Sequence, residues 1–379
     1  MIVRSTPTAL ERFSGGAMSD RGRNGLSDEE VEFYSRQIVM PHIGYQGQLK
    51  LRGASVCIAG VGGLGSPAAM QLAAMGVGHI RLVDFDVVEL SNLQRQHLYD
   101  VSSVGYPKVE TAARRLRALN PYVQIEPLPL VIGAHNAEEI VRGMDVVVDG
   151  LDHMAPRYAI NRACVKMGVP YVFGAAVSTY GNTSTIMPGQ SACLECLFGM
   201  IRDDALPSCS ILGVHPSILS LVASIEVSEA VRILLGQEPR LANRLLHCDI
   251  GALEFEGTEV ARSDDCPVCG PVPGPSPLPE QPLVTELCAR DGVRTFAVLP
   301  QRDMALDLDQ VDRLLTARGF PVSVKAELGR TFQWRQTDRA SLLVSGVLIV
   351  EGAGTEDEAQ EMYQSLVMEG LGASTKDLG

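Results

Sequence analysis

The chain has 379 residues, of which 46% are hydrophobic, so it is large enough for two or three domains with buried cores. Its formal net charge of −13 argues against nucleic acid or an anionic membrane as the main partner. No apolar run of about 18 residues is present, so we expect no membrane span. No apolar stretch follows a basic N-terminal start, so we expect no signal peptide. Nine cysteines then fit metal binding in a reducing cytoplasm better than disulfides.

The N-terminal part of the chain is polar and then becomes helical. Residues 1–25 are rich in Gly, Ser and Arg, and we expect them to be disordered. Ser27–Glu30 has the pattern of a capping box and predicts a helix to about Val39. Arg36 lies on this helix, where the simplest interpretation of a charged residue is a solvated surface position.

Residues 54–108 carry the pattern of a nucleotide-binding unit. An apolar run at 54–59 breaks into a glycine-rich turn, which a helical stretch at 66–75 and an apolar strand at 79–83 follow. Glycines in such a turn let backbone N–H groups approach a phosphate at the start of the helix. The glycines concerned are Gly60, Gly62, Gly63 and Gly65.

Two aspartates end this unit. In nucleotide-binding units an acidic residue about 20 positions after the glycine turn binds ribose hydroxyls, and Asp84 holds that position. Asp86 is explained equally well as a second nucleotide contact or as a solvated turn residue. The glycine turn and Asp84 alone would also allow an NAD-dependent oxidoreductase.

A polar string at 91–95 and a lysine follow. From position alone, the string could be an ordinary loop after a strand. Arg95, however, offers a planar fork of N–H donors that suits phosphate oxygens. Lys108 begins a helical pattern, where a positive charge opposes the helix dipole, so phosphate binding explains this lysine better than helix stability does.

Asp152 and His153 directly follow a third apolar strand, predicted at 144–149. Asp152 has one structural explanation, which is that it caps the helix predicted at 155–167. Two further strands are predicted at 171–176 and 182–187, the second in a mixed or antiparallel part of the sheet.

Four cysteines form two Cys-x-x-Cys pairs, and this spacing is typical of a tetrahedral zinc site. The four residues are Cys193, Cys196, Cys266 and Cys269. A site closed by four thiolates leaves no position for water, so we expect the zinc to be structural. Cys209 lies between the pairs, ahead of a long helix predicted at 216–235. Too few positively charged residues lie near it in the sequence to indicate an activated thiolate.

The last hundred residues form a separate pattern. Residues 271–282 are typical of a stiff proline-rich linker, and 283–379 read as a small α+β domain. Its predicted strands are 294–299, 322–326, 331–335 and 342–350, and its predicted helices are 308–318 and 355–366.

The strings Tyr34–Ile38, Ser91–Gln96 and Gly105–Glu110, together with the glycine turn, resemble the ThiF/MoeB/HesA family, the bacterial relatives of ubiquitin-activating enzymes. The resemblance covers residues 26–270, to which the C-terminal α+β domain at 283–379 is an addition. It implies an α/β fold with a Rossmann-like, mostly parallel sheet and an antiparallel extension. It also implies an adenylyltransferase that uses ATP to activate the C-terminal glycine of a ThiS/MoaD-like ubiquitin-fold sulfur-carrier protein and releases pyrophosphate.

The resemblance further implies roles for single residues. The string Ser91, Asn92, Leu93, Gln94, Arg95 contacts the nucleotide together with Lys108. Arg36 reaches the triphosphate in the neighbouring subunit of a homodimer. Asp152 binds Mg²⁺-ATP, although Leu151 and His153 depart from the usual residues beside it. Cys209 matches the position at which some members take the carrier covalently, while other members work without that cysteine.

The alternatives to an adenylyltransferase are a non-catalytic scaffold that binds nucleotide and carrier, and the NAD-dependent oxidoreductase. The scaffold is motivated by the altered positions Leu151 and His153. The oxidoreductase leaves Arg95 and Lys108 unexplained. Because the chain ends without Gly-Gly, we expect the carrier, which has a Gly-Gly C-terminus, to be a separate protein. The sequence leaves open whether this carrier supplies sulfur for molybdopterin, thiamine, tRNA thiolation or another pathway.

Overall fold

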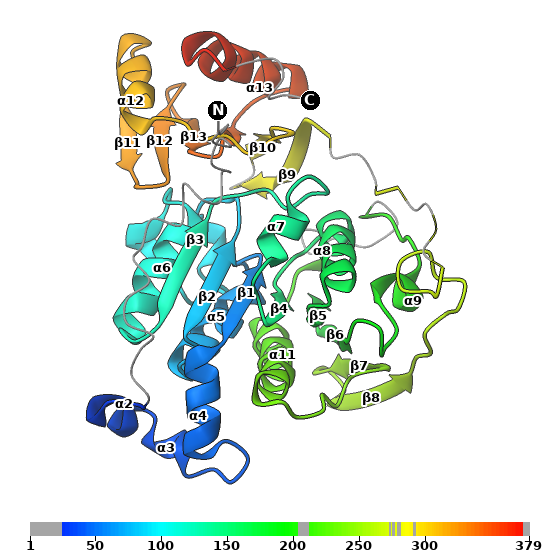
Figure 1. The fold of residues 1–379 in the computed structure, drawn as a ribbon. Coiled ribbons are helices and arrows are strands. Elements are labelled where there is room, and N and C mark those ends of the chain that lie inside the picture. Colours follow the sequence, from blue (N-terminus) through cyan, green and yellow to red (C-terminus); the bar gives the residue numbers. More distant parts are fainter. Residues whose placement is uncertain are drawn as a thin grey trace, which may run out of the picture.

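The computed structural model describes residues 25–203, 212–272, 274, 277–278, 282–290 and 293–373. Cys209, residues 1–24 and much of the proline-rich stretch lie outside these ranges. The described residues form two β-sheets, of eight and six strands (Figure 1). In the larger sheet the strand order is β3-β2-β1-β4-β5-β6-β7-β8. None of the described helices combines the length and the apolar character that crossing a bilayer requires.

The eight-stranded sheet is parallel in one half and antiparallel in the other, as the resemblance implied. Strands β3, β2, β1, β4 and β5 run parallel, and β5 to β8 pair antiparallel. The strands are β1 (Ser55–Ala59), β2 (His79–Val83), β3 (Gln124–Leu128), β4 (Val146–Asp149), β5 (Tyr171–Val177), β6 (Tyr180–Ile186), β7 (Arg244–Asp249) and β8 (Glu254–Glu259).

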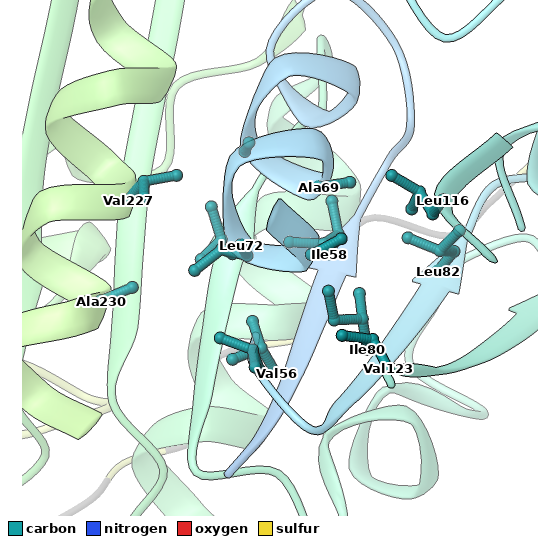
Figure 2. Packing of buried hydrophobic residues seen from close by; sticks show 14 of the residues in the cluster. Val56, Ile58, Ala69, Leu72, Ile80, Leu82, Leu116, Val123, Val227 and Ala230 are labelled. Carbon is teal, nitrogen blue, oxygen red and sulfur yellow. The ribbon is translucent and has the colours of Figure 1, made fainter. Parts of the chain in front are cut away.

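Helices cover both faces of the parallel half, and this explains why β1 and β4 are mostly apolar on both sides. Val56 and Ile58 of β1 point to a core that also holds Leu72 and Val227 (Figure 2). Cys57, which alternates with them, belongs to a second core on the opposite face. The first face carries α5 (Gly65–Ala74), α6 (Lys108–Leu119) and α11 (Pro216–Leu235), and the second carries α7 (Ala137–Val141) and α8 (Met154–Met167).

The N-terminal capping box is present, but the single helix predicted to Val39 is wrong. Ser27 Oγ accepts from the Glu30 N–H at 3.1 Å, and the Glu30 carboxylate accepts from the Ser27 N–H at 2.8 Å. The helix stops at Tyr34, which turns its buried hydroxyl inward to accept from Asn120 Nδ2 at 2.8 Å. The result is two short helices, α2 (Asp28–Phe33) and α3 (Ser35–Ile38), which precede α4 (Gly44–Gly53).

The six-stranded sheet is antiparallel throughout, with the order β11-β12-β13-β14-β10-β9. One expectation fails here, because the strand predicted at 342–350 is two strands joined by a turn at Gly346, whose φ is +87°. The elements are β9 (Val284–Arg290), β10 (Val293–Val298), α12 (Leu308–Ala317), β11 (Val322–Lys325), β12 (Gly329–Gln333), β13 (Arg339–Leu343), β14 (Leu348–Glu351) and α13 (Glu356–Tyr363), after which Gln364–Gly370 forms a π-helix.

Candidate active site

The glycine turn lies where β1 ends and α5 begins, next to the end of β4. At Gly60, whose φ is +85°, an added Cβ would lie 2.7 Å from the carbonyl oxygen of Gly150. At Gly65 an added Cβ would lie 1.9 Å from the carbonyl oxygen of Gly60. Side chains are therefore excluded at both positions, and the backbone stays open at the start of α5, where N–H groups attract anions.

Asp84 ties the glycine turn to the end of β2. Its carboxylate accepts from the Val61 N–H and from the Asp86 N–H, both at 2.8 Å. Burial raises the pKa of the Asp84 carboxyl, while the nearby positive charge of Lys108 opposes that shift. The carboxylate thus holds the turn in place at the edge where open α/β sheets bind their ligands.

Lys108 is buried at the start of α6, and its ammonium contacts Asp86. The distance from Lys108 Nζ to Asp86 Oδ2 is 2.7 Å, and only 6% of Lys108 is exposed. Burial lowers the pKa of Lys108, but the carboxylates of Asp86 and Asp84 outweigh that effect and raise it to about 12. Lys108 is therefore a fixed cation, and Asp86 is its partner rather than a solvated turn residue.

The side chains of the polar string at 91–95 differ in their burial and in their contacts. Asn92 is buried and its side-chain oxygen accepts from the Glu89 N–H at 3.2 Å, while Leu93 packs against the first core. Arg95 donates from Nη1 to the carbonyl oxygen of Ser91 at 2.8 Å. Gln94 and Ser91 are exposed. Only part of the string is thus free to contact a ligand directly.

Asp152 pairs with His153 instead of capping a helix. Its Oδ1 lies 2.8 Å from His153 Nδ1, whereas the carboxylate of Asp203 accepts from the N–H of Met154, the first residue of α8, at 2.6 Å. Capping as the explanation of Asp152 is therefore wrong. The signal for Asp203 as the cap was missing from the sequence, because it lies 49 residues beyond the helix start.

The Asp152 carboxyl is strongly acidic. Surrounding protein raises its pKa, but the hydrogen bond and positive charge of His153 outweigh this and lower the pKa to about 2. The same hydrogen bond raises the pKa of His153 to about 9. The two side chains are 79% and 55% exposed, so solvent screens the pair and leaves Asp152 accessible as an oxygen ligand.

Arg157 anchors the loop that carries Asp152, and the sequence analysis missed it. This buried guanidinium donates from Nε to Asp149 Oδ2 at 2.9 Å, and from Nη2 to the carbonyl oxygens of Leu151 at 2.6 Å and Gly174 at 2.8 Å. Asp149 also accepts from the Tyr171 hydroxyl at 2.6 Å. The sequence did not indicate this network, because the apolar run before Asp149 predicts a strand but not the hydrogen-bond partners of the aspartate that ends it.

Helix α3, which carries Arg36, lies away from these residues, at the other end of the larger sheet (Figure 1). Its neighbour Gln37 donates from Nε2 to the carbonyl oxygen of Met75, at the end of α5, at 2.7 Å. The Arg36 side chain is exposed and forms no hydrogen bond or ion pair with another described residue. The structure therefore does not bring Arg36 together with the glycine turn of its own chain.

The four cysteines of the two Cys-x-x-Cys pairs come together, with their sulfur atoms within 4.8 Å of one another. Cys193 Sγ lies 3.6 Å from Cys266 Sγ, and Cys196 Sγ lies 3.4 Å from Cys269 Sγ. Four ligands at about 2.3 Å from a tetrahedral zinc stand about 3.8 Å apart, which fits these distances. This cluster could hold a zinc ion.

The fold described above is a Rossmann-like α/β architecture with an antiparallel extension. Residues 34–268 match the ThiF family, and the chain belongs to that family. It is 41% identical over 251 residues to a sulfur carrier protein adenylyltransferase of Thermus thermophilus, which covers 65% of this chain and 93% of the relative. A SAMP-activating enzyme E1 of Haloferax volcanii is 40% identical over 246 residues, covering 65% and 91%. The crystal structure of E. coli MccB with ATP superposes with a TM-score of 0.55 at 25% identity, covering 62% of this chain and 74% of that one.

Proposed function

We propose that this chain uses ATP to adenylate the C-terminal glycine of a ThiS/MoaD-like ubiquitin-fold sulfur-carrier protein. One observation carries the proposal. The glycine turn, Asp84 and Lys108 share one edge of the sheet in a chain that aligns with 93% of a sulfur carrier protein adenylyltransferase. The comparisons give no support to the scaffold or oxidoreductase alternatives. Residues 26–270 would form the adenylating unit, working in the cytoplasm, with 271–282 as a linker to the unit at 283–379.

In the proposed reaction a carrier carboxylate oxygen attacks the α-phosphorus of ATP. The new oxygen–phosphorus bond forms as the bond to the bridging oxygen breaks, and pyrophosphate leaves with that electron pair. No general base is required, because a carboxylate is already ionised at pH 7. Catalysis then depends on holding the two reactants together and on neutralising phosphate charge.

The residues present fit these tasks. Lys108 is a fixed cation and Arg95 a half-buried one, so both suit phosphate oxygens. Asp84 would bind the ribose at the end of β2. Asp152, an accessible carboxylate that is ionised at neutral pH, is the residue that would hold Mg²⁺, which supplies charge neutralisation at the phosphates when bound.

The proposed enzyme is a homodimer, because the family resemblance gives Arg36 a contact with the nucleotide and Arg36 lies away from the glycine turn of its own chain. In a two-fold dimer the same surface is used by both copies, so an arginine from each chain can complete the other's site. The four-cysteine cluster would hold a structural zinc. Cys209 would be the position at which the carrier becomes covalently attached.

Carrier-dependent exchange of labelled pyrophosphate into ATP tests the proposal. Purified chain is assayed with each small Gly-Gly protein of its own genome, both intact and lacking the terminal glycine. We expect exchange with one intact carrier and none with its shortened form. Absence of exchange with every intact carrier, in protein that binds ATP and remains folded, would overturn the proposed function.

A further inference from the structure

The six-stranded sheet lies beside the parallel half of the larger sheet (Figure 1), and it packs on the segment that carries Asp84 and Asp86. Val87 belongs to a buried cluster with residues of that sheet, and the neighbouring Phe85 packs against the same cluster. The members from the C-terminal part of the chain, on the six-stranded sheet or directly beside it, are Ala297, Leu299, Leu343, Val347 and Ile349. In an extended segment alternate side chains face opposite sides, so the two acids face away from the sheet that their apolar neighbours contact.

Backbone hydrogen bonds join this segment to the one that leads into Lys108. The Gly105 N–H donates to the carbonyl oxygen of Val88, and the Val88 N–H donates to the carbonyl oxygen of Tyr106, both at 2.8 Å. The Lys108 N–H donates to the carbonyl oxygen of Asp86 at 2.9 Å. The position of the Lys108 ammonium therefore depends on the paired backbone segments that contain Asp86 and Gly105.

The six-stranded sheet and the loop that leads into its strand β12 donate hydrogen bonds on both sides of Lys108. Thr331, which is 4% exposed, donates from Oγ1 to the carbonyl oxygen of Gly105 at 2.6 Å. The Leu328 N–H donates to Glu110 Oε2 at 2.8 Å. These two bonds reach positions three residues before and two residues after the lysine.

The approach of the sheet is close at Gly105. The φ of Gly105 is +88°, and a Cβ added there would lie 3.1 Å from a methyl carbon of Val324. Thr331 is itself held, since its Oγ1 lies 2.7 Å from Ser341 Oγ on the next strand. A hydroxyl that is fixed in this way leaves its bonded carbonyl little freedom to move.

We propose that Thr331 is a positioning residue for Lys108, so that the six-stranded sheet acts as a brace for the phosphate-binding edge of the larger sheet. This inference rests on the proposed role of Lys108 in adenylation. It assigns to the C-terminal part of the chain a task in the reaction itself, since a small displacement of a charge-stabilising group lowers the rate of the chemical step.

The test compares three variants of the full chain in carrier-dependent pyrophosphate exchange. Thr331→Val removes the hydroxyl at nearly constant volume, and Thr331→Ser retains it. Thr295→Val changes a similarly buried threonine whose hydroxyl, among the described residues, bonds to the carbonyl oxygen of Val293 in its own strand. We expect kcat to fall about three- to tenfold in Thr331→Val, with little change in KM for the carrier, and to recover in Thr331→Ser. Thr295→Val should keep the wild-type kcat even where its melting temperature falls equally.

A second measurement does not depend on turnover. Binding of a non-hydrolysable ATP analogue should slow amide hydrogen exchange at 328–333, because two coupled sites stabilise each other reciprocally. Slowed exchange in a wild-type chain that adenylates no carrier would support the brace and overturn the proposed function. A wild-type kcat in Thr331→Val, or unchanged exchange at 328–333 with the analogue bound, would overturn the brace.

Discussion

Arg36 cannot reach the nucleotide edge of its own sheet. Gln37 anchors α3 to the carbonyl oxygen of Met75, at the far end of α5 from the glycine turn. Helix α5 has 10 residues and therefore spans about 15 Å at 1.5 Å per residue. This span exceeds the length of an arginine side chain, so the role that we propose for Arg36 requires a second copy of the chain.

Mixing two inactive variants tests this geometry. Arg36→Ala and Lys108→Ala homodimers should each lose on the order of 10²-fold or more in adenylation rate, since each lacks one charge at both sites. In a mixed dimer one site carries both substitutions and the other carries neither. Random pairing of equal amounts makes half the dimers mixed, so activity should recover to roughly a quarter of the wild-type value.

The assay is pyrophosphate exchange before and after subunit exchange, which mass spectrometry of differently tagged chains verifies independently. Arg36→Ala mixed with wild type serves as the matched control for dilution. If Arg36 acted within its own chain, every site in the mixed dimer would still hold one lesion. Verified mixed dimers without recovered activity would therefore refute the cross-subunit role.

Three further predictions concern the metal, Asp152 and acid stability. Fresh protein should contain about one zinc per chain, and Cys266→Ser should lower the melting temperature before it changes ATP affinity; a substoichiometric metal content would contradict the closed site. His153→Asn should lower KM for Mg²⁺-ATP by up to about fivefold, because Asp152 loses a competing cation; an unchanged or higher KM in pyrophosphate exchange would show that the pair does not compete. Burial raises the pKa of Glu126, but His79 and Arg81 outweigh it and lower the pKa, so the stability this carboxylate adds is present above the unfolded pKa of about 4.3 and lost as pH falls. Glu126→Gln should therefore cost about 1–3 kcal/mol in denaturant unfolding at pH 7 and less at pH 4, and an equal cost at both pH values would contradict the assignment.

Apolar runs and glycines allowed the larger sheet to be predicted. Strands β1 and β4 are buried on both faces, so their sequences are almost entirely apolar and easily recognised, whereas β2 carries the partly buried His79 and Arg81 among its apolar residues. The edge strand β8 is exposed along its whole length and carries almost no such pattern, so it was not predicted. The turn at Gly346 was missed because the apolar residues on both sides of it read as one strand.

The site was predictable where local spacing or the family resemblance points to a residue, and not where contacts are distant in sequence. The glycine turn and Asp84 follow from a local pattern, and Arg95 and Lys108 from the resemblance. Asp203 and Thr331 are far from the segments they contact, by 49 and 226 residues. Their roles depend on which loops the fold brings together, and no spacing in the sequence encodes that.

The held and the free residues of the site differ in a way that fits the proposed reaction. Asp84 and Lys108 are fixed by hydrogen bonds and by each other's charge, and the fixed backbone around them comes from both sheets. Asp152 and Arg36 are exposed, as are Ser91 and Gln94. Fixed groups suit the ribose and phosphate, whose places in the site must not vary, because pre-organised charges cost no rearrangement during the reaction. Exposure suits Asp152 if it binds a metal that arrives with the nucleotide, and it suits Arg36 if it enters a site in another chain. Both side chains must remain accessible until those ligands bind.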